Sequence, residues 1–437
     1  MNDKYDLAIV GGGLSGSTLA LHLKRRGWRG RLAIVEPGAL GLGLAYSTRD
    51  PDHLLNVYAG RMGVYADAPG DFADWMAARD LPWGPSDFVP RALYGEYVAA
   101  RLTEAGGIDH RQARAEDLFP EGGGYRLKLS DGSELLAGKV VLALGNFRPR
   151  WPGVLAAIES DPRLIADPWD RMRQADLPQG ARVLLVGTGL TMIDVALTLA
   201  GSGHTAPMLA VSRHGLLPQP HLPIRAAAPP VQFADLPASP LGILRWLRAK
   251  AREGGDWGPW VDALRPVTQA LWRSWSGAER ARFLRHAKTY WEVHRHRLAP
   301  PVVERLRGER ANGWLHLMAG RVASVDASGP TLKVEIDQRG GGQRRVEVDA
   351  IVNCTGPCSD PRRAEDPFLD KLLTQGLVQP DAFGLLTDEA GALMAADGKA
   401  VEGLYALGPL TKPALWEITA VPDIRTQASQ LATLLAP

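Results

Sequence analysis

Three glycines and one carboxylate near the start of the chain have the types and spacing of a dinucleotide-binding turn. Gly11, Gly13 and Gly16 follow a short apolar run, and Glu36 follows the next one. The first glycine permits a tight turn, the second lets a pyrophosphate approach the backbone, and the third lets a helix pack against its strand. A carboxylate in the position of Glu36 can accept hydrogen bonds from a ribose diol. We expect a dinucleotide to contact Gly11, Gly13, Leu14, Ser15, Gly16 and Glu36.

A second glycine turn with different chemistry follows in the other half of the chain. Gly187 and Gly189 repeat the first two glycine positions, but Met192 occupies the third. The next apolar run ends at Arg213, and a guanidinium can bind an adenosine 2′-phosphate through two hydrogen bonds. The alternative is a surface arginine at a strand end. We expect NADPH rather than NADH here, in contact with Gly187, Thr188, Gly189, Leu190, Thr191 and Arg213.

Each turn lies within segments that have the apolar pattern of a β-α-β unit. The first half predicts a strand at 5–10, a helix at 14–26 and strands at 31–35, 125–129 and 135–145. The second half predicts a strand at 181–186, a helix at 190–200 and strands at 207–211, 314–325, 332–336 and 345–352. The two halves are therefore organised alike.

The pattern predicts an α/β fold with two Rossmann-like dinucleotide-binding domains, of the glutathione-reductase type, and a helical insertion. The first domain comprises 1–150 and 357–437, the second comprises 151–356, and the insertion within the second comprises 218–313. After a proline-rich opening, the insertion is expected to form helices at 241–251, 260–275 and 278–295. A last apolar strand is expected at 403–408.

The composition excludes several classes of protein. The chain has 437 residues and a formal net charge of only +2, which argues against a nucleic-acid binder and a polybasic membrane protein. Two cysteines, Cys354 and Cys358, are too few for a disulfide scaffold or a cysteine zinc site. No apolar run approaches the roughly 18 residues of a membrane span, and the N-terminus lacks a signal-peptide pattern. We therefore expect a cytoplasmic protein without a metal site.

Two dinucleotide sites in one chain of this size suggest a flavoprotein. FAD would occupy the first site, and NADPH in the second would pass a hydride to the flavin ring. Two further strands end in glycine, at Gly145 and Gly356, and glycine there lets the chain pass closely over a cofactor. We therefore count both glycines among the expected FAD contacts.

The small net charge hides one basic and aromatic segment. Residues 241–310 contain 15 lysines and arginines against 7 acids, and six of the 13 tryptophans. As a cap over the flavin, this segment would bind the carboxylate of an anionic substrate through its arginines. As an exposed surface, it would resemble a platform for nucleic acid or a partner protein. The tryptophans recur mostly within helical patterns, which favours the cap.

Several longer segments carry a more specific resemblance. They are GLGLAYST at 41–48, HLLNVYAGRMGV at 53–64, FVPRALYGEYV at 88–98, VLLVGTGLTMID at 183–194, RHRLAP at 295–300 and GLYALGPLTKPALWEITAVPDIR at 403–425. With them the chain resembles a bacterial FAD/NAD(P)-binding family that includes the amino-acid N-oxygenases of diazo and hydrazine natural-product pathways, of the aspartate type that forms nitrosuccinate. The stretch NFRPRWPG at 146–153 departs from the FxGxxxH-type linker of other flavin monooxygenases.

The resemblance implies further residues near the flavin. It places Tyr46, Asn56 and Met62 beside the flavin, although Asn56 and Met62 could equally be packing residues. It also implies that four residues close over the ring end: Gly408, Trp416, Glu417 and Ile418.

The residue types favour monooxygenation over dithiol chemistry. Cys354 and Cys358 span a Gly-Pro turn, and structural cysteines are the better interpretation. We expect an FAD-dependent, NADPH-using monooxygenase that hydroxylates a small polar, amino-containing substrate with molecular oxygen through a flavin hydroperoxide. The alternatives are an NADPH-dependent flavin reductase or dehydrogenase without oxygen insertion, and a non-catalytic FAD-containing binding protein.

Two residues are candidates for a catalytic role, Asn56 and His294. The helix predicted at 278–295 places His294 on one face with Phe283, Ala287 and Tyr290. His294 there could orient a substrate or help in proton transfer, but a hydrogen-bonded core histidine is the more common case. His294 and His296 point apart on a helix, so they do not form a metal site.

Overall fold

The computed structural model describes residues 3–170, 174–221, 228–254 and 256–436 of the chain. It divides into two compact units, Met1–Phe147 with Cys358–Pro437, and Arg148–Pro357. Residues 222–227, in the proline-rich opening expected for the insertion, and residue 255 lie outside the described residues.

The first unit is built on an eight-stranded sheet with the order β16-β17-β6-β1-β2-β3, to which β5 and β4 are added beside β6. Its strands are β1 Asp3–Val10, β2 Leu32–Val35, β3 Asp109–Arg111, β4 Ala115–Glu121, β5 Gly124–Leu129, β6 Glu134–Leu142, β16 Ala392–Met394 and β17 Ala400–Ala406, with a separate pair β14 Pro380–Asp381 and β15 Gly384–Leu385. Its helices are α1 Leu14–Arg25, α2 Gly43–Tyr46, α3 Asp71–Ala77, α4 Arg91–Ala105, α13 Pro367–Thr374 and α14 Val421–Leu435.

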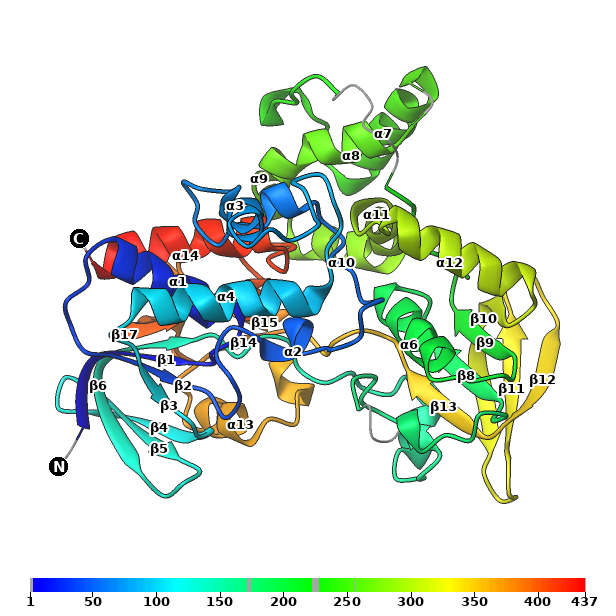
Figure 1. The fold of residues 1–437 in the computed structure, drawn as a ribbon, viewed down its shortest axis with the longest axis horizontal. Helices are drawn as coiled ribbons and strands as arrows, with labels where there is room; N and C mark the ends of the chain where they lie inside the picture. Colours follow the sequence, from blue (N-terminus) through cyan, green and yellow to red (C-terminus); the bar gives the residue numbers. More distant parts are fainter. Residues whose placement is uncertain (1–2, 171–173, 222–227, 255, 437) are drawn as a thin grey trace. The chain divides into compact units, whose positions relative to one another are not determined.

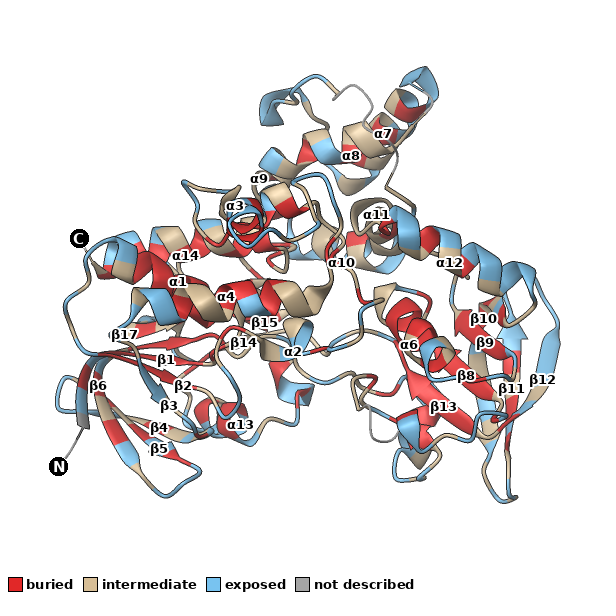
Figure 2. Ribbon diagram, viewed as in Figure 1, coloured by how far each residue is buried: buried red, intermediate tan, exposed pale blue. Residues whose placement is uncertain are grey.

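Both faces of the first sheet are covered. Because side chains alternate along a strand, Leu7 and Ile9 of β1 pack on one face, and Ala8 and Val10 pack on the other. Helices α1, α4 and α14 cover the first face, whereas the β4–β5 hairpin and α13 lie on the second (Figure 1). The parallel strands β17, β6, β1 and β2 therefore form a buried centre (Figure 2).

The second unit has a seven-stranded sheet with the order β12-β11-β10-β9-β8-β13-β7. Its strands are β7 Leu164–Ile165, β8 Val183–Val186, β9 Met208–Ser212, β10 Leu315–Asp326, β11 Leu332–Gln338, β12 Gln343–Val348 and β13 Ala350–Asn353. Its helices are α6 Leu190–Gly201, α7 Pro240–Gly254, α8 Gly258–Leu264, α9 Thr268–Ser274, α10 Gly277–His286, α11 Lys288–Arg295 and α12 Pro300–Ala311. Short 3-10 helices complete the chain: Ala59–Arg61, Gly153–Ile158, Phe233–Asp235, Arg265–Val267, Pro361–Arg363 and Gly408–Thr411.

Three predicted elements differ from the observed ones. The strand expected at 345–352 is two strands, because the chain changes neighbours at Asp349, whose carboxylate binds Arg182. The helix expected at 260–275 is interrupted by a 3-10 turn at Pro266, which lacks an amide donor. The helix expected at 278–295 is two helices that meet at Ala287. Among the described residues, no helix has the length and hydropathy needed to cross a membrane.

Candidate functional site

Four parallel neighbours in the first sheet, β17, β6, β1 and β2, end at the same edge. The residues shortly after these ends are Gly408, Gly145, Gly11 and Glu36. Ligands of parallel α/β sheets bind outside the carboxyl ends of the strands. The fold thus brings together four residues that are far apart in the sequence and that we expected to contact one dinucleotide.

The first turn has no room for side chains at its glycines. Gly11 has a φ of +104°, and a Cβ there would lie 2.3 Å from the carbonyl oxygen of Ala143, just after β6. A Cβ at Gly16 would lie 2.0 Å from the carbonyl oxygen of Gly11, so α1 packs directly on the turn. No side chain caps the N-terminus of α1, which begins after Gly13. Unpaired amides at a helix N-terminus fit a pyrophosphate.

Glu36 is held in position at the same edge. The amide of Gly12 donates to its Oε2 at 2.9 Å, and the amide of Gly38 donates to its Oε1 at 3.0 Å. A carboxylate can accept about four hydrogen bonds. Glu36 therefore keeps acceptor capacity for the two hydroxyl groups of a ribose.

Gly408 lies close to the beginning of α1, in a conformation that favours glycine. It has a φ of +72°, and a Cβ there would lie 2.3 Å from Oγ of Ser15. Its amide donates to Oε1 of the buried Gln427 at 2.9 Å, and Nε2 of Gln427 donates to Oγ1 of Thr411 at 2.9 Å. Sequence reasoning missed Gln427, although a glutamine on the apolar face of α14 is an available signal.

The segment around Tyr46 lies against the first turn. The Cα of Gly43 is 3.3 Å from where a Cβ of Gly13 would stand, so the backbones of turn and segment touch. The ring of Tyr46 packs on that of Tyr94 with centroids 4.7 Å apart. Burial raises the pKa of the Tyr46 hydroxyl, which keeps it neutral.

Asn56 and Met62 lie on the loop that leads into and out of the 3-10 turn Ala59–Arg61. Met62 is buried, 2% exposed, among the apolar residues beneath α1 and α14, whereas Asn56 is half-buried. The structure thus makes Met62 a packing residue of the loop, and its contact with a flavin stays a prediction.

Two residues outside the expected set fix this loop. Arg425 of α14 donates to the carbonyl oxygens of Arg61 and Gly63 at 3.0 Å and 2.9 Å. The hydroxyl of Tyr97 on α4 accepts from the amide of Val64 at 3.0 Å. Because the bonds join residues that are 33 to 364 positions apart in the sequence, no local pattern revealed them.

Trp416, Glu417 and Ile418 form the connection between β17 and α14. Trp416 and Ile418 are buried, and Glu417 is half-buried with a φ of +65°. A non-glycine residue in this region costs about 1–3 kcal/mol and occurs preferentially at functional sites. The strained backbone therefore supports, as a hypothesis, a role for Glu417 at the ring end of a cofactor.

The second unit repeats the geometry of the first turn. The neighbours β9, β8 and β13 are parallel and end near Arg213, Gly187 and Gly356. Gly187 has a φ of +120°, and a Cβ there would lie 2.2 Å from the carbonyl oxygen of Cys354, just after β13. No side chain caps α6, which begins after Gly189.

Gly356, whose contact with FAD stays a prediction, belongs to the second unit, because β13 pairs with β7 and β8. It is the counterpart of Gly145 and joins Gly187 rather than Gly408.

Hydrogen bonds around the second turn fix the loop that carries Arg213. Oγ1 of Thr188 lies 2.8 Å from Oγ of Ser212 and donates to the carbonyl oxygen of Leu216 at 2.6 Å, which fixes the loop that carries Arg213. Arg213 itself is exposed. Thr191 and Leu190 begin α6 beside the turn. The side chain of Thr188 is thus structural, and its backbone is what could contact a nucleotide.

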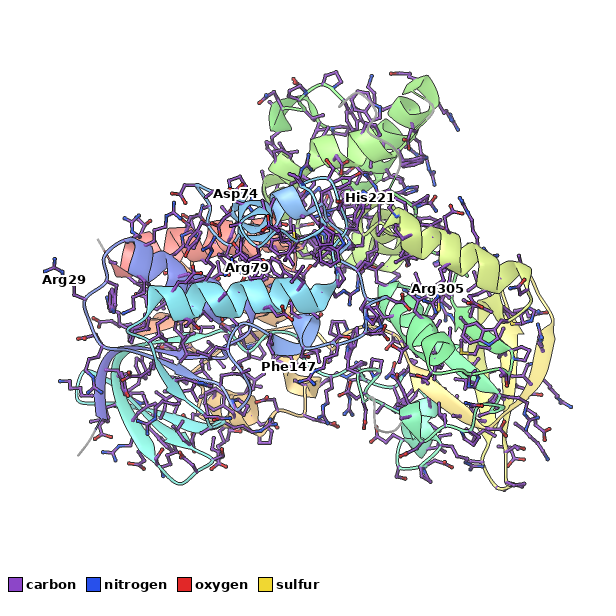
Figure 3. All side chains as sticks on the ribbon, viewed as in Figure 1. Arg29, Asp74, Arg79, Phe147, His221 and Arg305 are labelled. Carbon is purple, nitrogen blue, oxygen red and sulfur yellow. The ribbon has the colours of Figure 1, made fainter. Side chains whose placement is uncertain are left out.

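The two cysteines belong to different units, and so do the two catalytic candidates. Cys354 is buried in the second unit, and burial raises the pKa of its thiol. Cys358 belongs to the first unit, where its backbone forms an isolated antiparallel β-bridge with that of Phe147, a residue labelled in Figure 3. Asn56 and His294 also belong to different units.

The fold and the paired glycine turns are those of two-domain dinucleotide-binding proteins. Within this class, residues 8–147 match the model of a family described as FAD-NAD(P)-binding, which confirms the expected type of domain in this part of the chain.

Three solved structures extend the similarity over the whole chain. Lysine 6-monooxygenase of Pseudomonas syringae is 17% identical, with a TM-score of 0.69 over 99% of this chain and 99% of that chain. The FAD-bound cadaverine monooxygenase of Erwinia amylovora is 13% identical, with a TM-score of 0.69 over 99% and 95%. Ornithine N-hydroxylase of Kutzneria sp. 744 is 15% identical, with a TM-score of 0.66 over 99% and 99%. These similarities confirm the predicted fold class.

Proposed function

We propose that the chain is an FAD-dependent, NADPH-using monooxygenase that hydroxylates the nitrogen of a small amine or amino acid. The observation that carries the proposal is the similarity, over nearly the whole of both chains, to three enzymes that act on lysine, cadaverine and ornithine. One of them was crystallised with FAD, and another with reduced FAD, NADP⁺ and ornithine. The reaction would convert R–NH₂, O₂, NADPH and H⁺ to R–NHOH, H₂O and NADP⁺.

The residues of the chain fit the two cofactors. In the first unit, Gly11 and Gly16 let the turn pack closely on α1, whose N-terminal amides would bind a pyrophosphate, and Glu36 would hold the ribose. When bound, FAD supplies the redox chemistry that activates oxygen. In the second unit, Gly187 and Arg213 would hold NADPH.

Disulfide-reductase chemistry fits less well. It needs two neighbouring cysteines with accessible thiols, whereas Cys354 is buried and Cys358 belongs to the other unit. We therefore prefer monooxygenation to disulfide reduction. If the test below fails, a flavin oxidase or flavin reductase is the remaining function.

Product analysis of the holoenzyme tests the proposal directly. With NADPH and oxygen, we expect one of lysine, ornithine, cadaverine or aspartate to give a product heavier by one oxygen atom, detected by mass spectrometry. NADPH consumption should rise with that amine, and hydrogen peroxide release should fall. Peroxide release in proportion to NADPH with every amine would contradict the proposal and favour a flavin oxidase or reductase. Aspartate in the panel also tests the expected anionic substrate and the amino-acid N-oxygenase resemblance.

Arg213→Ala tests the assignment of NADPH to the second turn. A charge-assisted hydrogen-bonded contact contributes about 1.5–3 kcal/mol, so KM for NADPH should rise roughly 10- to 100-fold, whereas KM for NADH should change little. The matched control is Arg344→Ala, which removes an exposed arginine from β12 and should leave both constants unchanged. Equal effects of Arg213→Ala on the two coenzymes would refute the 2′-phosphate contact.

A further inference from the structure

Arg213 belongs to a short turn, residues 212–215, that directly follows β9 and that we call the Arg213 turn. The amide of Gly215 closes it by donating to the carbonyl oxygen of Ser212 at 3.3 Å and to Oγ of Ser212 at 3.0 Å. Arg213 and His214 are therefore its two central residues. Arg213 is exposed, whereas His214 is half-buried, so the two neighbouring side chains have different surroundings.

The two ends of the Arg213 turn are held by the nucleotide-binding part of the second unit. At the first end, Oγ of Ser212 lies 2.8 Å from Oγ1 of Thr188, which belongs to the second glycine turn. At the other end, Gly215 has a φ of +61°, and a Cβ there would lie 2.9 Å from the amide nitrogen of Ala319 in β10. Neither contact involves the side chains of the two central residues.

The helical insertion holds the centre of the Arg213 turn. The imidazole of His214 packs on the ring of Tyr290 in α11, with ring centroids 5.3 Å apart and planes at 51°. Further along the same segment, the amide of Gln219 donates to the carbonyl oxygen of Val293, also in α11, at 2.8 Å. Rings at such separations attract one another beyond the area that they bury. The segment that begins with Arg213 is thus attached to the insertion as well as to the sheet.

The contact uses His214 as a ring and not as a hydrogen-bonding group. Its Nδ1 is buried and has no hydrogen-bond partner in the part of the chain that the structure describes. A buried nitrogen without a partner costs stability, because it has lost its hydrogen bond to water. A phenyl ring could make the same contact with Tyr290 without this cost, so packing is what the imidazole contributes here.

We propose that His214 and Tyr290 are positioning residues for Arg213, and that the helical insertion thereby contributes to a preference for NADPH over NADH. This role rests on the proposed function, in which Arg213 binds the 2′-phosphate of NADPH. Because His214 is the next residue in the same turn, holding its ring fixes the direction in which Arg213 leaves the backbone. A guanidinium binds a phosphate through two hydrogen bonds only in a suitable orientation. NADH lacks this phosphate, so its binding does not depend on the orientation of Arg213.

Calorimetric titration of the holoenzyme with NADP⁺ and with NAD⁺ tests this role. Loss of the ring contact in His214→Ala or Tyr290→Ala should weaken NADP⁺ binding roughly two- to tenfold and leave NAD⁺ binding nearly unchanged. His214→Phe and Tyr290→Phe keep both rings and should bind the two coenzymes like the wild type. The double alanine variant should be no weaker than either single one, because each change already removes the same contact.

The matched control is His204→Ala, which removes another histidine ring from the second unit. His204 packs on Trp314 with ring centroids 6.1 Å apart, but it precedes β9, whereas His214 follows it. This variant should have a lower melting temperature and an unchanged ratio of NADP⁺ to NAD⁺ affinity. Equal weakening of both coenzymes by His214→Ala would mean a merely structural contact and would overturn the proposal. Equal loss in His214→Phe and His214→Ala would also overturn it, because the imidazole would then bind the phosphate itself.

Arg213→Ala in the same titrations distinguishes the possible failures. If it weakens NADP⁺ binding and His214→Ala does not, the positioning role is wrong and the coenzyme assignment stands. If Arg213→Ala leaves NADP⁺ binding unchanged, both are wrong. The titrations require no amine, so the expected binding pattern in an enzyme that hydroxylates no amine would refute the proposed monooxygenation and still support the role of His214.

Discussion

Gly11→Ala is expected to yield a protein that is purified without FAD. An added Cβ would meet the carbonyl oxygen of Ala143 at 2.3 Å, a backbone atom that cannot move without shifting the end of β6. The φ of +104° adds a conformational cost of about 1–2 kcal/mol for any residue with a Cβ. Relief of the overlap would displace the turn from the N-terminus of α1. We expect FAD binding to weaken at least about 100-fold, measured by flavin absorbance after purification and by titration with FAD.

Gly132→Ala is the control that distinguishes the effect of backbone strain from damage to the FAD-binding turn. Gly132 has a φ of +79° in the turn between β5 and β6, and nothing lies within 4 Å of the added Cβ. This variant bears a similar conformational cost without the overlap, so it should lose about 1 kcal/mol of stability and keep its FAD. Equal FAD content in the two variants would show that the first turn does not hold the cofactor.

The first and second turns could be predicted because their chemistry is local. The whole pattern consists of six backbone residues, two flanking apolar strands and one charged residue at the end of the next strand. The structure explains why glycine is required. Gly11 packs on the carbonyl oxygen of Ala143 and Gly187 on that of Cys354, each of which directly follows the neighbouring strand. Met192 shows the limit of the motif, since it replaces the third glycine and is fully buried in α6.

What the sequence could not give is the set of contacts between distant segments. Gln427 holds the amide of Gly408, and Arg425 holds the loop of Asn56 and Met62. Arg425 ends the segment 403–425 that carries the family resemblance, but the segment does not reveal the partner of either side chain. The pairing of β13 with β8, which brings the carbonyl oxygen of Cys354 against Gly187, also depends on sheet topology rather than on local pattern.

The insertion shows what composition leaves open until the geometry is known. Its excess of arginines suggested a site for a carboxylate, and two of them bind backbone carbonyl oxygens of other helices: Arg280 binds that of Trp272, and Arg297 binds those of Gly258 and His294. The tryptophans, which suggested a core, in part surround a cavity. The prediction that Phe283, Ala287, Tyr290 and His294 share a face is confirmed, since all four line that cavity across the break at Ala287.

Gly187→Ala is expected to weaken NADPH binding while FAD binding is retained. The added Cβ would lie 2.2 Å from the carbonyl oxygen of Cys354 and would displace the second turn. Gly187 belongs to the second unit, whereas the expected FAD contacts other than Gly356 belong to the first. The variant should therefore retain FAD and be reduced normally by dithionite, while KM for NADPH rises at least about 100-fold. Anaerobic absorbance of the flavin measures both reductions in one experiment.

Gly189→Ala tests the same assignment of NADPH to the second turn without disturbing the fold. Gly189 has an ordinary φ of −84°, and nothing in the protein lies within 4 Å of an added Cβ, so the variant should have the melting temperature of the wild type. The methyl group would nevertheless occupy the space through which a pyrophosphate approaches the N-terminus of α6. We expect weaker reduction by NADPH in this variant and no change in Gly313→Ala, a turn glycine of the same unit with open space around it. If NADPH reduced the flavin of both Gly187→Ala and Gly189→Ala at the normal rate, the hydride donor would bind elsewhere. A methyl group that does not disturb the fold can slow flavin reduction only by obstructing a ligand at this turn.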